Sequence, residues 1–372
     1  MPKFFNKITR SFISLLNLLA LVFIGLAYLG AHVSPVHISF VSFIGFAFPL
    51  LWVVNVLFVI HWAIKRRKRI VFSLAALALT WTLWSSVFNF NLGKKADIKE
   101  LDNPVTVMSY NVRMFDKYVW TGDKETPQKI YQFIKDQNPD ILCIQEFYIN
   151  NKNNQYSENN ILSQFKQFKY KNLEYNIETK SGKKYGLATF SKYPIIDKKP
   201  LLFKNTTNFS TQTDIDVNGT KIRVFNNHLE SIRLQRENYK FIDTLEFKND
   251  EATRRGLYDI FKKLNIAFEH RATQAETIGR HIENSPYPSV VCGDFNDTPV
   301  SYVYRKVKGE LKDAFKESGS GLGGTYNGNL PSFRIDFIFH DEDFKSYNYE
   351  KFKVDYSDHY PILTTIDLTP IK

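Results

Sequence analysis

Residues 290–299 read VVCGDFNDTP, and the second half of the chain can be read as built around this stretch. Two β-branched residues lead into Gly293; Asp294 and Asn296 then follow two positions apart, before Pro299 closes the segment. Such a pattern is typical of a buried strand that ends in a loop. Because alternate residues of an extended chain point to the same side, both polar side chains can address one point. An acid and an amide at that point suit a hard cation or an attacking water.

Almost all of the excess positive charge of the chain lies in its first quarter. The 372 residues carry a formal net charge of +11, and residues 1–95 contain ten Lys and Arg but no Asp or Glu. The remainder is therefore close to neutral, which gives no support to the basic groove that a nucleic-acid-binding protein needs. The two cysteines, Cys143 and Cys292, each lie in an apolar strand-like run. We expect buried free thiols there, with one bridge between them as the alternative.

Three long uncharged apolar runs precede this near-neutral part, at about residues 11–33, 38–64 and 70–90. Each reaches the roughly 20 residues that cross a bilayer as a helix. The first run is longer than the core of a signal peptide, so we interpret it as a retained anchor, with a cleaved signal as the alternative. The sequence therefore predicts three transmembrane helices within residues 1–90, followed by a polar tether over residues 91–103.

Basic residues set the expected orientation of these helices. Three precede the first run, the sequence KRRKR occupies residues 65–69, and the link at residues 34–37 has none. The positive-inside rule then places the N-terminus and the 65–69 loop in the cytoplasm. Three crossings put the rest of the chain in the periplasm or outside the cell. We therefore expect a multi-pass protein of the inner or plasma membrane.

The remaining residues, 104–372, have the pattern of a mixed α/β domain. Strand-like runs alternate irregularly with helical patterns at residues 126–138 and 252–282. The pair Asn218-Gly219 separates two strand-like runs and is a strong hairpin signal. This irregular alternation favours a largely antiparallel α/β sandwich over a doubly wound parallel sheet.

Polar residues recur where the strand-like runs of this part end. They are Asn111, Glu146, His228, Asp294, Asn296, Asp358 and His359. Residues at the ends of several strands converge on one rim, where α/β folds build their sites.

Hydrolysis of a phosphate ester needs residues of these types. A divalent cation must neutralise the phosphoryl oxygens, and Asn111, Glu146 and Asp358 offer the hard oxygen ligands that Mg²⁺ or Mn²⁺ prefers. Histidines can contact phosphate and move protons near neutral pH, which suits His228 and His359. A histidine that acts as a base needs an orienting acid, and Asp336 is a candidate.

Each of these residues also has a structural alternative. Asn111 could be a turn residue, Glu146 a solvated strand end, and His228 a surface histidine. Asp336 could be an ion-pair partner of Arg334, two positions before it. The functional interpretation is favoured because five strand-like segments end in suitable polar residues together.

The motifs occur in an order that resembles the endonuclease/exonuclease/phosphatase superfamily. They are MSYN at 108–111, QE at 145–146, NHL at 227–229, GDFN at 293–296, RIDF at 334–337 and SDHYP at 357–361. The resemblance covers about residues 103–368. It implies a four-layer α/β sandwich with two mixed, mostly antiparallel sheets, and Mg²⁺-dependent hydrolysis of phosphate esters.

The resemblance also implies a role for each residue. The implied metal ligands are Glu146 as the main one, with Asn111 and Asp358 close by. Asp294 and Asn296 would orient the attacking water and the phosphate. His359, paired with Asp336, would be the base or a phosphate clamp, and His228 would stabilise the phosphate or protonate the leaving group.

Two departures from the family pattern narrow the choice of branch. Arg113 follows Val112, whereas abasic-site enzymes continue the first motif with Asn-Gly at this point. Tyr360 stands where the phosphoinositide branch usually has Lys. Both branches are therefore disfavoured.

Together these features predict a membrane-anchored, divalent-metal-dependent phosphoesterase that hydrolyses phosphodiester bonds, most simply a nuclease. The alternative enzyme is a phosphodiesterase or phosphatase acting on lipid head groups, like a sphingomyelinase, because an anchor holds it where such substrates are concentrated. A catalytically inactive binding protein is a third interpretation. The expected partners are a phosphate-ester substrate, either nucleic acid or phospholipid, and the lipid bilayer; no protein partner is predicted.

Overall fold

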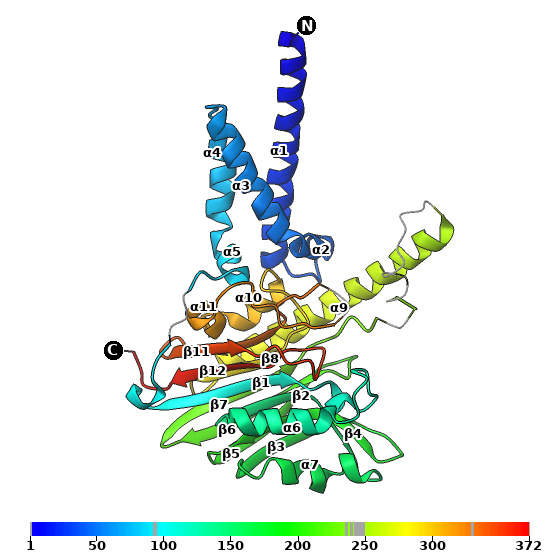
Figure 1. Cartoon of the computed structure of the whole chain (residues 1–372), viewed down its shortest axis with the longest axis vertical. Coiled ribbons are helices and arrows are strands. Elements are labelled where there is room, and N and C mark those ends of the chain that lie inside the picture. The colour runs from blue at the N-terminus through cyan, green and yellow to red at the C-terminus, as the bar shows by residue number, and fades with distance from the viewer. Residues whose placement is uncertain are drawn as a thin grey trace.

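The computed structural model describes residues 2–91, 95–234, 237–238, 241, 250–328 and 331–371. Figure 1 shows a group of helices that rises from one end of a layered sandwich of sheets and helices. The helices of this group are α1 (Pro2–His32), α2 (Phe40–Phe46), α3 (Phe48–Ile64), α4 (Ile70–Leu79) and α5 (Trp81–Val87).

One helix among the described residues, α1, is long and apolar enough by itself to cross a membrane, over Thr9–His32. The predicted second and third runs are each broken: α2 and α3 meet at a bend of 67°, and α4 and α5 at a bend of 60°. The number of candidate spans rises to three if each bent pair is counted as one.

Of the three predicted transmembrane helices, the structure therefore has the first as a single helix, whereas the second and third runs are each divided into two. Pro49 lies at the start of α3, and a proline there cannot continue the hydrogen bonding of a preceding helix. In the third run the break falls at Thr80, whose hydroxyl donates back to the carbonyl of Ala76 at 2.7 Å. Such back-bonding by threonine bends helices.

The sandwich contains two six-stranded sheets. The first has the order β11 (Lys345–Lys351), β12 (Ile362–Asp367), β1 (Pro104–Asn111), β2 (Ile141–Asn150), β4 (Lys183–Ser191), β3 (Tyr170–Glu178). The second has the order β5 (Ile195–Leu202), β6 (Phe209–Val217), β7 (Thr220–His228), β8 (Ser289–Asp294), β10 (Asp336–His340), β9 (Lys312–Asp313). One pair in each sheet is parallel, β1–β2 and β7–β8, and the others are antiparallel. The predicted mixed, mostly antiparallel α/β sandwich is confirmed.

Helices cover the outer face of each sheet and make four layers (Figure 1). The first sheet packs against α6 (Thr126–Gln137) and α7 (Glu158–Gln164), and the second against α9 (Glu251–Glu283) and α10 (Tyr302–Lys308). A further short helix among the described residues is α11 (Ala314–Ser318). Between the sheets lies an apolar core that includes both cysteines, which are free and buried.

The segment between α5 and β1 is bound to the sandwich at several of its described residues. The side-chain amide of Asn89 donates to the carbonyls of Phe315 and Lys316, both at 2.8 Å. The buried guanidinium of Arg334 in turn donates to the carbonyl of Ser86, near the end of α5, at 2.8 Å. These bonds fix the apolar helices relative to the edge of the sheet from which β10 starts.

Candidate active site

Strand register brings the predicted residues of the second sheet to one edge. His228 and Asp294 are paired partners at the ends of the parallel strands β7 and β8. Asp336 starts β10 and is paired with Asp294 from the other side. Gly293 makes this possible, because it has φ +136° and any Cβ there would collide with the backbone of Asn227.

Asp294 lies at the centre of the cluster and is 1% exposed. Its Oδ2 accepts a hydrogen bond of 3.0 Å from the amide of Asn111, at the end of β1 in the other sheet. The same oxygen lies 3.8 Å from Nε2 of His228 and 3.6 Å from Nε2 of His359. Burial raises the pKa of Asp294, and His359 offsets part of that rise.

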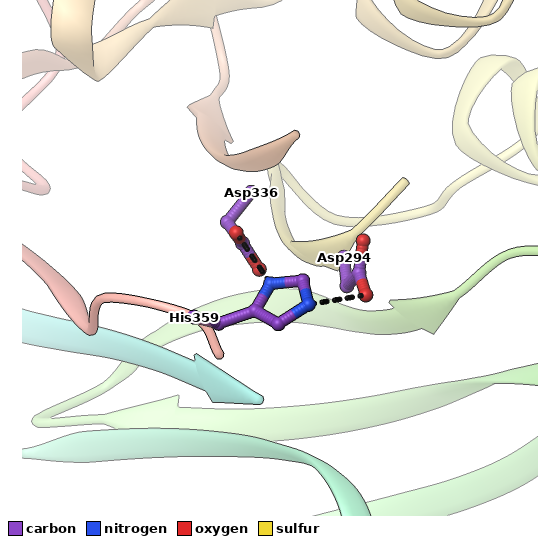
Figure 2. A group of neighbouring side chains, drawn as sticks. All are labelled: Asp294, Asp336 and His359. Carbon is purple, nitrogen blue, oxygen red and sulfur yellow. Dashed lines mark hydrogen bonds and ion pairs between the residues drawn. The ribbon is translucent and has the colours of Figure 1, made fainter. Parts of the chain in front are cut away.

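His359 and Asp336 form the predicted pair (Figure 2). Nδ1 of His359 donates to Oδ2 of Asp336 at 2.9 Å, and both residues are buried. Burial by itself lowers the pKa of His359, but Asp336 and Asp294 together raise it well above its usual value. The two carboxylates therefore favour the protonated form of the imidazole.

The alternative interpretation of Asp336, as the ion-pair partner of Arg334, does not hold. Arg334 pairs with Asp313 at 2.8 Å rather than with Asp336. The Oδ1 atom of Asp336 is buried and has no hydrogen-bond partner among the described residues. The carboxylate is therefore free to serve His359, as a residue that orients a histidine must be.

Glu146 reaches the cluster through an irregularity in β2. The register against β4 shifts between Ile144 and Phe147, and Glu146 between them has φ 52°. Its Oε1 lies 3.4 Å from Nδ2 of Asn111 and 3.9 Å from Nε2 of His228. Burial, followed by the charge of Asp358, raises the pKa of Glu146 to about 7.

Asp358 is held by a residue that the sequence analysis noted only as a departure from the family pattern. Nε of Arg113 lies 3.2 Å from Oδ2 of Asp358, and its guanidinium stacks 4.3 Å from the centroid of Trp120. The four residues from Arg113 to Asp116 all have φ between 45° and 55°. Consecutive left-handed residues without glycine are costly, and such strain is concentrated at functional sites.

Asn296, at φ 53°, follows Asp294 and braces it. Its backbone N–H donates to Oδ1 of Asp294 at 2.8 Å, and its side-chain amide donates to the carbonyl of Leu229 at 3.0 Å. These bonds fix the loop after β8 against the end of β7, and so they orient the Asp294 carboxylate.

Two sets of residues in this cluster have ligand chemistry for a metal. Asp294, Asp336 and His359 bring one ligand atom each within 4.8 Å of one another, but two of these residues are already joined by the His359–Asp336 bond. In the predicted set, Glu146 and Asp358 have partly exposed side chains, at 29% and 22%, and repel each other. Two like charges that solvent can reach fit a hard divalent cation, so Asn111, Glu146 and Asp358 stay the predicted metal ligands.

The cluster opens into a pocket of about 490 Å³. Six of the eight predicted site residues line it: Glu146, His228, Asp294, Asn296, Asp358 and His359. Asn111 and Asp336 lie behind this lining and contact it through Asp294 and His359. The lining also includes Phe46, Leu264 and Phe333, which the sequence analysis did not select.

Comparisons with known proteins agree with this fold. The model of the Endonuclease/Exonuclease/phosphatase family matches residues 108–359, and that of a domain of unknown function matches residues 10–87. No protein with a curated description matches the chain.

Two solved structures illustrate the similarity of fold. An endonuclease/exonuclease/phosphatase from Beutenbergia cavernae is 16% identical with a TM-score of 0.52, covering 72% of this chain and 72% of that one. A family protein from Bacteroides thetaiotaomicron is 16% identical with a TM-score of 0.50, covering 71% of this chain and 97% of that one. At this identity the similarity shows the shared sandwich alone.

Proposed function

Since the chain belongs to the endonuclease/exonuclease/phosphatase family, we propose that its pocket hydrolyses phosphodiester bonds with the help of a divalent cation. One observation carries the proposal: the acids Glu146 and Asp294 and the histidines His228 and His359 line a single pocket. They come from different strands and loops, and their side chains lie within about 4 Å of one another or of a shared neighbour. Polar residues with purely structural roles would not be expected to converge on one pocket in this way.

Asn111, Glu146 and Asp358 would hold the cation, either Mg²⁺ or Mn²⁺. When bound, it neutralises the phosphoryl oxygens and polarises the phosphorus centre. The raised pKa of Glu146, caused by burial and then by Asp358, supports this assignment, because a positive charge beside both carboxylates relieves it.

The protein groups around Asp294 supply the proton chemistry. Oδ2 of Asp294 accepts the proton of the attacking water, whose oxygen forms the new bond to phosphorus as the bond to the leaving oxygen breaks. The protonated His359 binds a phosphoryl oxygen and keeps it in place. Burial lowers the pKa of His228, so its neutral ring donates a hydrogen bond to the phosphate or to the leaving oxygen.

The test of this proposal is a panel of substrates cleaved by the full chain in detergent. Plasmid DNA, RNA, sphingomyelin, phosphatidylinositol phosphates and bis-p-nitrophenyl phosphate would each be incubated with Mg²⁺, with Mn²⁺ and with EDTA. We expect at least one to be cleaved with metal, and EDTA to abolish that cleavage. A nuclease, the simplest case from the sequence, requires that DNA or RNA be among them. Failure of every substrate with both metals would refute the proposal.

We also propose that α1 and the two bent pairs anchor the protein in a membrane, with the N-terminus in the cytoplasm. A buried polar contact joins them: the Asn17 side chain accepts from Trp62 at 2.9 Å and donates to Ser73 at 3.0 Å. Hydrogen bonds of this kind hold membrane helices together. A reporter that is active only in the periplasm, fused after Leu101, should be active; activity of a cytoplasmic reporter at that position would contradict three crossings.

A further inference from the structure

The pocket has a second, apolar half that the hydrolytic groups do not explain. Besides the residues at the strand ends, its lining includes Phe46 of α2, Leu264 of α9 and Phe333, which we call the apolar wall. All three side chains are only partly buried, so their apolar surfaces are open to the pocket. A phosphate ester that touched only the acids and histidines would leave this wall in contact with water, which is unfavourable for apolar surface.

Phe46 belongs to the apolar helices, and packing fixes it at the pocket. Its ring centroid lies 5.5 Å from that of Phe333 and 5.7 Å from that of Phe268. Phe43, one turn earlier, lies 4.8 Å from Phe261 and 5.0 Å from Phe268. The helix α2 is thereby part of the wall of the pocket and also part of the group that we propose to lie in the membrane.

The position of α2 places the pocket next to the expected membrane surface. Figure 1 shows α2 at the foot of α1 and α3, on the side of the sandwich. Around it the chain exposes large apolar side chains: 51% of Ile38, 62% of Phe40, 71% of Tyr258 and 51% of Phe261. Exposed aliphatic and aromatic side chains of this kind bury themselves at the boundary between head groups and acyl chains.

The charges of the pocket do not fit a polyanion. Among the described residues that line it, Arg233 is the one Lys or Arg, and it is paired with Glu230 at 2.9 Å. A nucleic acid strand needs several cations along its phosphates. A molecule with one phosphate ester and an apolar remainder needs only the cation site and the wall.

We infer that the substrate is an amphiphilic phosphate ester taken from the bilayer, whose apolar chain lies against Phe46, Leu264 and Phe333 while its phosphate reaches His228 and His359. This inference rests on the proposed function, and it names the class of molecule that the site accepts. The sharp turn between α2 and α3 is consistent with such a substrate, because it places Phe46, next to a proposed membrane helix, in the lining of the pocket.

The test uses alkyl p-nitrophenyl phosphates whose alkyl chain grows from methyl to dodecyl, each below its aggregation concentration, with the full chain in phosphatidylcholine nanodiscs and Mg²⁺. Water attacks phosphorus and p-nitrophenolate leaves in every case, so the chemistry stays constant. For the wild type we expect kcat/KM to rise roughly fourfold for each methylene over the first carbons, as apolar burial predicts. In Phe46→Ala and Phe333→Ala this rise should be much weaker, with roughly tenfold or more lost on the dodecyl ester.

Phe72→Ala is the matched control, since Phe72 is a phenylalanine of α4 that is 63% exposed and lies outside the pocket lining. It should keep the full dependence on chain length. Equal rates for all chain lengths in the wild type would overturn the inference while leaving the hydrolase intact. The inference would also be overturned if an oligonucleotide were cleaved faster than the dodecyl ester and if Phe46→Ala slowed that cleavage. That result would mean that the apolar wall stacks on nucleic acid bases. No cleavage of any ester with either metal would instead refute the proposed function.

Discussion

Glu146→Gln is expected to lower kcat/KM by a factor on the order of 10³ while leaving the protein folded. The substitution keeps the shape of the side chain and removes the charge that we propose binds the cation. Kinetics as a function of Mg²⁺ concentration would measure both the lost rate and the weakened affinity for metal. Glu178→Gln, an exposed change on β3, is the control and should have wild-type kinetics.

The same variant tests the electrostatics of the metal-free site. Burial and Asp358 raise the pKa of Glu146 to about 7, above its value in an unfolded chain. A raised carboxyl pKa means that the folded state disfavours the charged form, so stability falls as the pH rises from about 4.5 through 7. With EDTA, the wild type should lose Tm between pH 4.5 and pH 7 to a greater degree than Glu146→Gln. Equal changes in both proteins, or no effect of adding Mg²⁺, would contradict this account.

Asp336→Asn is expected to lower kcat by a factor of about 10² to 10⁴, as expected when a histidine loses its orienting carboxylate. The variant removes one of the two acids that raise the pKa of His359, so that pKa should fall. If the protonated ring binds the phosphate, activity should then be lost at a lower pH than in the wild type. The pH dependence of kcat, with NMR of the His359 ring nitrogens, measures this shift.

Asp197→Asn, an exposed change on β5, is the control for the loss of an acid. It should leave the pH profile in place. A lower Tm in Asp336→Asn with an unchanged pH profile would mean that Asp336 only supports the fold.

The sandwich was predictable because its elements carry local signals. The Asn218-Gly219 pair forms the hairpin between β6 and β7, with φ 52° and 93°. The helical pattern at 252–282 corresponds to α9, Glu251–Glu283. The bends in the second and third apolar runs were missed since hydropathy alone was considered, although Pro49 was a visible signal for the first of them.

The polar residues of the site were visible because each follows a strand, and strand ends meet at a rim. The structure brings all eight predicted site residues together, while their individual roles stay predictions. Arg113 was missed as a partner of Asp358 because its left-handed turn depends on tertiary contacts. Phe46 could not be found either, since a helix at one end of the chain reaches the pocket only through packing on α9 and Phe333.

In the proposed site Glu146 and its neighbours hold the cation, Asp294 and His359 act on water and phosphate, and Asp336 orients His359. The most direct measurement is the anomalous scattering of Mn²⁺ soaked into crystals of the full chain. Our account predicts a peak in contact with Glu146, beside Asn111 and Asp358, that disappears in Glu146→Gln. A peak enclosed by Asp294, Asp336 and His359, with none at Glu146, would contradict it.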